Sequence, residues 1–230
     1  IPAGAKDARR GQWVQGPGLQ FFNAITAALP EAKLIAEDLG YITAGVAELR
    51  KAARLPGMKV LQFAYGHDDN NVNLPHFFPA DAVVYTGTHD NDTTRGWLDS
   101  LDDEHFTQIA DYFGLTRADS AWGLLRAAFA SVAKLVVLPM QDLLDLPSTA
   151  RMNRPGTTEG NWRWRFTPQD LTRLTERRLR LLQHWHALFD RTGDARQREF
   201  SAPPDELPSS LEGSSSVAQP SVVTVTPSLS

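Results

Sequence analysis

The sequence predicts an α/β fold built around parallel strands, and three observations support this expectation. Short apolar runs begin near residues 34, 60, 82 and 135. Segments with apolar side chains at helical spacing separate these runs, a pattern typical of parallel strands that are buried on both faces. Polar side chains directly follow two of the runs, as they do where a parallel sheet presents chemistry at its carboxyl edge.

The first predicted strand, Leu34 to Ala36, lies between two predicted helices. The earlier helix spans Leu19 to Leu29, where the apolar residues share one helical face and Pro30 ends the run. The later helix should begin after Thr43, because a threonine hydroxyl group is a suitable N-cap.

Three further strands are predicted at Val60 to Ala64, Ala82 to Thr86 and Leu135 to Leu138. They are rich in β-branched and other apolar residues, which suit buried strands. Two helices should precede the last strand, one from Asp102 to Phe113 and one that begins after Thr116 as its N-cap.

A long helix is predicted to open at Thr167, with Pro168 at its first position. The composition then changes, since residues 201–230 contain nine Ser and five Pro but no Lys or Arg. Such a segment buries too little apolar surface to offset its ordering entropy, so we expect a disordered tail. The sequence therefore predicts a folded region over residues 1–200 and a tail over residues 201–230.

The spacing of the strands leaves two architectures open. Successive strands start 26, 22 and 53 residues apart, and the last interval holds two helices. A βα unit of a (β/α)8 barrel takes roughly 30 residues, so four units would form about half of such a barrel. An open doubly wound sheet has the same local pattern.

Composition excludes several classes of function. The net charge of −4 gives no reason to expect nucleic acid or an anionic membrane as a partner. The absence of cysteine excludes disulfides, thiolate catalysis and cysteine-bound zinc. The chain has no apolar run of roughly 20 residues and no signal-peptide pattern, and we expect a cytoplasmic location. It begins at Ile1 rather than Met, which suggests that it starts within a longer protein.

Two strand ends carry the candidate chemistry. Glu37 follows three apolar residues, so its carboxyl group should be partly desolvated, which favours the protonated form and suits a general acid. An N-cap or a salt-bridged carboxylate is the alternative. His89 and Asp90 follow the third strand, where a simple polar turn is an equally good interpretation. A metal site of these two residues with Asp92, extended by His67 and Asp68, matches no named motif.

Four motifs in a fixed order resemble the amylomaltases, which are 4-alpha-glucanotransferases of the alpha-amylase clan. The motifs are Ala36-Glu37-Asp38-Leu39-Gly40, Pro56 to Phe63, Tyr85 to Thr94, and a stretch with Arg151-Met152-Asn153, Pro155-Gly156 and Gly160-Asn161-Trp162. The resemblance runs from about Ile1 to Arg191. It implies the C-terminal half of a retaining (β/α)8-barrel enzyme, with strands five to eight, that transfers α-1,4-glucan segments between malto-oligosaccharides without a cofactor or a metal.

The resemblance also assigns roles to individual residues. Glu37 matches the general acid/base, and Asp90 matches the carboxylate that stabilises the oxocarbenium-like transition state. His89 matches a sugar-hydroxyl contact, and Arg151 and Asn153 belong to a loop that the family uses at the substrate cleft.

One part of the family pattern has no counterpart here. The nucleophilic aspartate follows the fourth strand of the barrel, upstream of Ile1, and Asp38 belongs to the fifth-strand motif and does not replace it. We therefore expect a chain that is inactive alone and whose partner is the missing N-terminal half of the barrel. The alternatives are a non-catalytic α-glucan-binding fragment and a metal-dependent hydrolase that uses His89 and Asp90.

Overall fold

The computed structural model describes residues 1–191, except residues 8, 13, 41, 66–70, 119, 173 and 175. The chain divides into two units, Ile1–Gly193 and Asp194–Ser230, and all described residues belong to the first. The tail predicted over residues 201–230 lies outside the described residues, as do His67 and Asp68 of the metal hypothesis.

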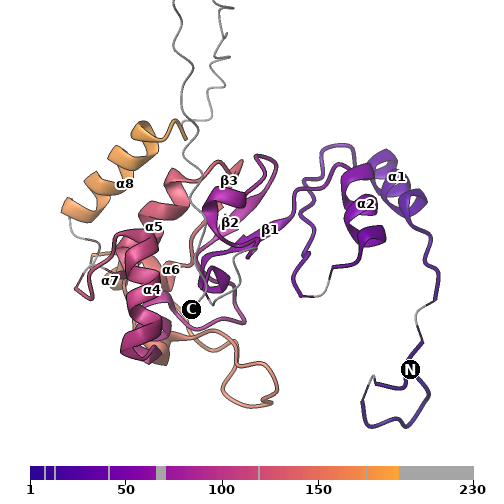
Figure 1. Ribbon diagram of the computed structural model, residues 1–230, viewed down its shortest axis with the longest axis horizontal. Helices are drawn as coiled ribbons and strands as arrows, with labels where there is room; N and C mark the ends of the chain where they lie inside the picture. Colours follow the sequence, from indigo (N-terminus) through magenta and orange to yellow (C-terminus); the bar gives the residue numbers. More distant parts are fainter. Residues whose placement is uncertain are drawn as a thin grey trace, which may run out of the picture. The chain divides into compact units, whose positions relative to one another are not determined.

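A small parallel sheet forms the centre of the first unit (Figure 1). Its strands are β1 (Met58–Val60), β2 (Val83–Tyr85) and β3 (Leu135–Val137), in the order β1-β2-β3. Met58 pairs with Val83, and Val83 pairs with Leu135, so all three strands are in parallel register. A further parallel bridge joins Ala36 to Gly57, the residue before β1. The predicted α/β class with parallel strands is confirmed.

The predicted strands are all shorter than expected, and two of them differ most. The run Leu34 to Ala36 contributes only the single bridge at Ala36. The strand predicted over Val60 to Ala64 ends at Val60, because Leu61–Phe63 forms a 3-10 turn, η1. Gln62 explains the change, since its backbone N–H donates to the Thr86 carbonyl at 3.2 Å and its side chain donates to the Asp92 carbonyl at 2.9 Å. These bonds turn the chain toward the loop after β2.

Several helix boundaries match the sequence predictions. Thr43 accepts a hydrogen bond from the Val46 N–H at 3.4 Å and caps α2, and Asp102 caps α4, which ends at a left-handed Gly114. The described helices are α1 (Leu19–Ala28), α2 (Ala44–Ala52), α3 (Thr94–Ser100), α4 (Asp103–Phe113), α5 (Ser120–Ala130), α6 (Met140–Leu143), α7 (Pro168–Leu171) and α8 (Glu176–Leu188), with 3-10 turns η2 (Pro75–Phe77) and η3 (Ser148–Ala150).

Two helix predictions are wrong. Because α5 begins at Ser120, Thr116 does not cap it. The long helix predicted from Thr167 is two helices, since α7 stops after one turn and α8 starts separately. Thr167 and Asp170 do form a reciprocal capping box. The hydroxyl group of Thr172 then donates to the Gln169 carbonyl at 2.6 Å, a local bond that competes with continuation of the helix.

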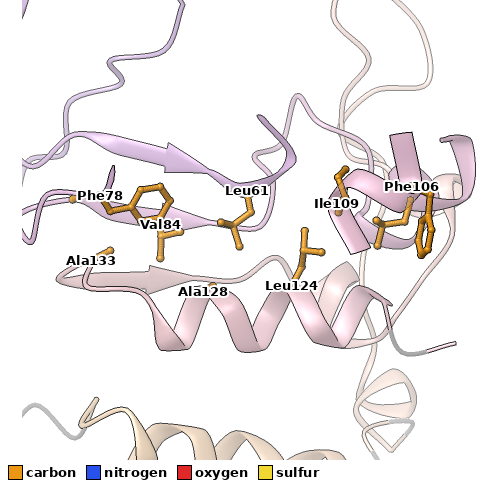
Figure 2. Close-up of a cluster of buried hydrophobic side chains, with 10 residues drawn as sticks. Leu61, Phe78, Val84, Phe106, Ile109, Leu124, Ala128 and Ala133 are labelled. Atoms are coloured by element: carbon orange, nitrogen blue, oxygen red, sulfur yellow. The ribbon is translucent and has the colours of Figure 1, made fainter. Parts of the chain in front are cut away.

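The hydrophobic core lies between the sheet and α5, which contacts α3, α4, α6 and α8. Figure 2 shows Val84 and Leu61 facing Leu124 and Ala128 of α5. A second cluster attaches α8, where Trp185 lies 5.7 Å from Trp122 between ring centroids. This core supports the sheet from one side and leaves the carboxyl ends of its strands free to form a site.

The amino-terminal helices contribute little to this core. Neither α1 nor α2 has a buried residue, and Phe21 is 51% exposed. Full burial of such a side chain would contribute about 1.5–3 kcal/mol, so a large part of that stabilisation is absent here. No described helix is long and apolar enough to cross a membrane.

Candidate active site

The carboxyl ends of the strands open into one cavity of about 890 Å³. Its walls come from the residues that follow Ala36, β1, β2 and β3. Glu37 and Asp90 both line it, with β1 lying between their two strand positions. The two strand ends therefore face one pocket, as is typical of parallel strands, which end at the same edge of a sheet.

The carboxylate of Asp90 is held in place but remains half-exposed. Asn153 donates from its side-chain nitrogen Nδ2 to Asp90 Oδ1 at 2.6 Å, and His89 Nε2 lies 3.4 Å from the same oxygen. Arg151 donates through Nη2 to the Asp90 carbonyl at 2.6 Å. The structure thus brings together four of the five predicted site residues, with His89, Arg151 and Asn153 gathered around Asp90.

The loop after β2 has its own internal support. Asn91 Oδ1 accepts from both the backbone N–H and the hydroxyl group of Thr88, each at 2.9 Å. The backbone N–H of Asp90 donates to the same hydroxyl oxygen at 3.2 Å. A Cβ at Gly87 would lie 2.5 Å from Gln62 Nε2, so a side chain at this position would have to displace that supporting amide. These contacts turn Asp90 toward the cavity.

Asp92 connects the same loop to the turn η3. Its carboxylate accepts from the Ser148 hydroxyl group at 2.7 Å and from the Thr93 N–H at 2.8 Å. Arg151 Nη1 lies 3.9 Å from the same carboxylate. Arg151 therefore interacts with two acidic positions of the loop and holds the segment after η3 against it.

The predicted desolvation of Glu37 is wrong for this chain, because its side chain is exposed. The run before it forms only one bridge, so no flanking strand among the described residues covers the carboxyl group. The neighbouring Asp38 is the less exposed carboxylate, with 14% of its side-chain area accessible. Its carboxylate accepts from the Met58 N–H at 2.6 Å and lies 3.2 Å from Arg50 Nε. Asp38 thus anchors the Glu37 segment to β1.

Asp142, which no sequence motif indicated, lies in α6 just after β3 and is 2% exposed. Its carboxylate accepts from the Thr86 hydroxyl group at 2.5 Å and from the N–H and hydroxyl groups of Thr94 at 2.7 and 2.8 Å. Burial raises the pKa of this carboxyl group above its usual value, and the three hydrogen bonds oppose that rise. Asp142 therefore holds both ends of the loop that carries Asp90. A polar residue soon after a strand was the available signal.

The raised pKa of Asp142 predicts a pH-dependent stability. The Asp142 carboxyl group binds its proton more tightly in the folded state than in the unfolded state. Its contribution to the free energy of unfolding is therefore largest below the usual carboxyl pKa, and it falls as the pH rises through the pKa of the folded state. When the pH is lowered from about 7 to about 4, the unfolding midpoint of the wild type should rise relative to that of Asp142→Asn. The expected rise is about 2–4 °C for each kcal/mol that protonation of Asp142 adds to the free energy of unfolding. Thermal unfolding followed by circular dichroism measures this difference.

Asp111→Asn is the matched control for this experiment, because Asp111 is exposed on α4 and the substitution removes the same charge. Its midpoint should follow that of the wild type across the pH range. If the curves for wild type and Asp142→Asn stay parallel, the buried carboxyl group does not couple folding to protonation.

The metal hypothesis gains no support from the described part of the chain. Within it, no three His, Asp or Glu side chains gather closely enough to hold a metal ion. The groups that donate to Asp90 are instead Arg151, which donates to its carbonyl, and Asn153, which donates to its carboxylate.

Comparisons with known proteins agree with the four sequence motifs that resemble the amylomaltases. A family model described as 4-alpha-glucanotransferase matches residues 1–172. The chain is 49% identical over 167 residues to the chloroplastic/amyloplastic 4-alpha-glucanotransferase DPE1 of Arabidopsis thaliana, covering 72% of this chain and 29% of that protein. It is 45% identical over 178 residues to a 4-alpha-glucanotransferase of Streptococcus pneumoniae, covering 76% and 35%.

Among solved structures, the fold resembles the amylomaltase from Streptococcus agalactiae in complex with acarbose. The TM-score is 0.75 at 33% identity, and the alignment covers 83% of this chain and 38% of that one. The chain thus spans about a third of the length of the proteins that it matches.

Proposed function

The chain belongs to the 4-alpha-glucanotransferase family, and from this membership we propose that it forms the C-terminal half of a (β/α)8 barrel that transfers α-1,4-glucan segments. The observation that carries the proposal is the shared cavity of Glu37 and Asp90 at the ends of parallel strands. The sequential order of Ala36, β1, β2 and β3 supports it, since consecutive barrel strands are neighbours.

Retention of configuration at the sugar requires two carboxyl groups about 5–5.5 Å apart across the scissile bond. We assign Glu37 as the general acid/base that protonates the leaving oxygen and later deprotonates the acceptor hydroxyl group. The nucleophile would come from a segment outside these 230 residues, because no residue of the chain matches the family's nucleophilic aspartate. The exposure of Glu37 supports a nucleophile from another segment, because the two carboxyl groups must face each other across a space that holds the scissile bond.

We assign Asp90 the role of stabilising the positive charge that develops on the sugar in the transition state. A preorganised carboxylate stabilises such charge without reorganising during the reaction. Asn153 supplies that preorganisation through its bond to Oδ1, while His89 and Arg151 are assigned to substrate binding. Malto-oligosaccharides are the proposed substrates, and the acarbose complex of the structural neighbour supports a saccharide in this cavity. The predicted cytoplasmic location stays a prediction.

The isolated chain should be inactive on maltotriose and should self-associate. It would lack the nucleophile, and half of a barrel exposes two unpaired strand edges. The exposed apolar side chains of α1 and α2 add to this tendency. Chromatography of products from maltotriose tests the activity, because transfer makes glucans both shorter and longer than the substrate. Size-exclusion chromatography tests the self-association.

A chimera tests whether this chain supports activity once the rest of the enzyme is present. Residues 1–172 of this chain replace the matching segment of the Streptococcus pneumoniae relative, which provides the remainder of the enzyme. The chimera should disproportionate maltotriose. If instead the isolated chain does so at a rate that Glu37→Gln abolishes, the nucleophile lies within residues 1–230 and our assignment is wrong.

A non-catalytic glucan-binding fragment is the second candidate function. The absence of a matching nucleophile favours it, because the rest of the cavity is present without that group. A chimera without transfer activity, combined with glucan binding by the isolated chain, would favour this candidate over the first.

A further inference from the structure

Trp162 lines the cavity beside Asp90, yet none of the proposed roles uses it. Its side chain is 54% exposed, although an indole ring is large and mostly apolar. In the core of this protein, Trp122 and Trp185 bury their rings against each other, so Trp162 is used differently. An exposed aromatic face in a cavity that also presents polar side chains is a binding surface for a ligand that has both apolar and hydroxylated sides.

The backbone holds Trp162 in this place. Its φ of 60° lies in the left-handed region, which a bulky residue adopts only when the surrounding structure requires it. The N–H group of Trp162 donates to the Met152 carbonyl at 2.7 Å, and Arg165 Nη1 donates to the Trp162 carbonyl at 2.9 Å. The ring is therefore presented by a closed loop.

The residue before it reinforces that loop. Asn161 Oδ1 accepts from the Arg154 N–H at 2.9 Å, and Asn161 Nδ2 donates to the Thr157 carbonyl at 3.1 Å. These bonds connect the two ends of the turn that leads to Trp162. The position of the indole is consequently a property of the loop and needs no ligand to form.

The indole lies next to the proposed catalytic carboxylate. Its ring centroid is 4.9 Å from that of His89, with an angle of 38° between the rings, and His89 Nε2 is 3.4 Å from Asp90 Oδ1. Asn153 donates to the same Asp90 oxygen. One wall of the cavity thus places an aromatic face beside groups that hydrogen-bond to hydroxyl groups.

We propose that Trp162 binds one pyranose ring of an α-glucan by stacking, next to Asp90. A pyranose presents axial C–H groups on its flat sides and hydroxyl groups at its rim. The C–H groups meet the electron-rich indole face, while rim hydroxyl groups reach His89, Asp90 and Arg151. This inference rests on the proposed function, since both place a glucan in the same cavity.

Maltoheptaose binding to the 230-residue chain tests the inference. Saturation-transfer NMR titrations suit this purpose, because the method tolerates a self-associated protein. Trp162→Ala should raise the Kd roughly tenfold, and Trp162→Phe, which keeps a smaller aromatic face, should raise it only about threefold. Trp164→Ala should leave the Kd unchanged, because Trp164 is in the same loop and packs near Phe166 at 6.3 Å between centroids.

The outcomes separate this inference from the proposed function. Wild-type binding that Trp162→Ala does not weaken would overturn the stacking role and leave the proposed function standing. No saturable binding by the wild type would overturn the stacking role, while transfer by the chimera would still decide the proposed function. Circular dichroism verifies that each variant is folded. If folded Trp162→Phe loses as much affinity as Trp162→Ala, the aromatic face is not the binding element and the inference is wrong.

Discussion

Replacing Glu37 by glutamine in the chimera should slow maltotriose disproportionation by about 10²–10⁴-fold. The two side chains have nearly the same size, so the cavity wall that Glu37 forms should keep its shape. Glutamine cannot donate a proton to the leaving oxygen or remove one from the acceptor hydroxyl group, and both steps of the double displacement therefore slow down. Initial rates measured from the appearance of glucans longer than maltotriose give the effect.

Glu48→Gln is the matched control for this substitution. Glu48 is exposed on α2, and its replacement changes the same functional group outside the cavity. The rate of this variant should equal that of the unmodified chimera. A Glu37→Gln chimera that retains more than about a tenth of the rate would show that Glu37 is not the general acid/base.

Replacing Asp90 by asparagine should lower kcat by about 10²–10³-fold with little change in KM. The oxygen Oδ1 of an asparagine can still accept the hydrogen bond from Asn153, so the side chain should keep its orientation. What is lost is the negative charge, and that charge interacts most strongly with the positive charge that develops on the sugar in the transition state. A loss confined to the transition state appears in kcat.

Steady-state kinetics of the chimera with maltotriose separate the two constants. Asp111→Asn on α4 is the control, since it removes an exposed negative charge that lies outside the cavity. An Asp90→Asn chimera with a raised KM and an unchanged kcat would assign Asp90 to ground-state binding and contradict the proposed role.

The main elements of the fold could be predicted because their signals are local. The apolar runs near Val84 and Val136 predicted β2 and β3 from composition alone, and Asp102 and Gly114 bounded α4 through cap chemistry. The extent of the strand after Val60 could not be predicted. Leu61 to Phe63 is as apolar as a strand, and only the bonds of Gln62 to the loop after β2 turn it into a 3-10 turn.

The candidate site was predictable to a similar degree. Because parallel strands end at one edge, the polar residues after two of them had to lie near each other, and Glu37 and Asp90 do share a cavity. The exposure of Glu37 was not predictable, because it depends on what covers the strand before it. The segments that would cover this strand come from other parts of the fold, and the residues next to Glu37 do not indicate them.

By itself, the sequence determined the α/β class and the family, because periodicity, caps and motifs are properties of neighbouring residues. The order of the strands in the sheet was decided by the structure. Only the tertiary structure decided how the site is held together. Thr86 and Asp142 are 56 positions apart, and His89 and Trp162 meet across a comparable separation. The hydrogen bonds of the Asp142 carboxylate and the exposure of the Trp162 indole both depend on which distant segments of the chain pack next to these side chains.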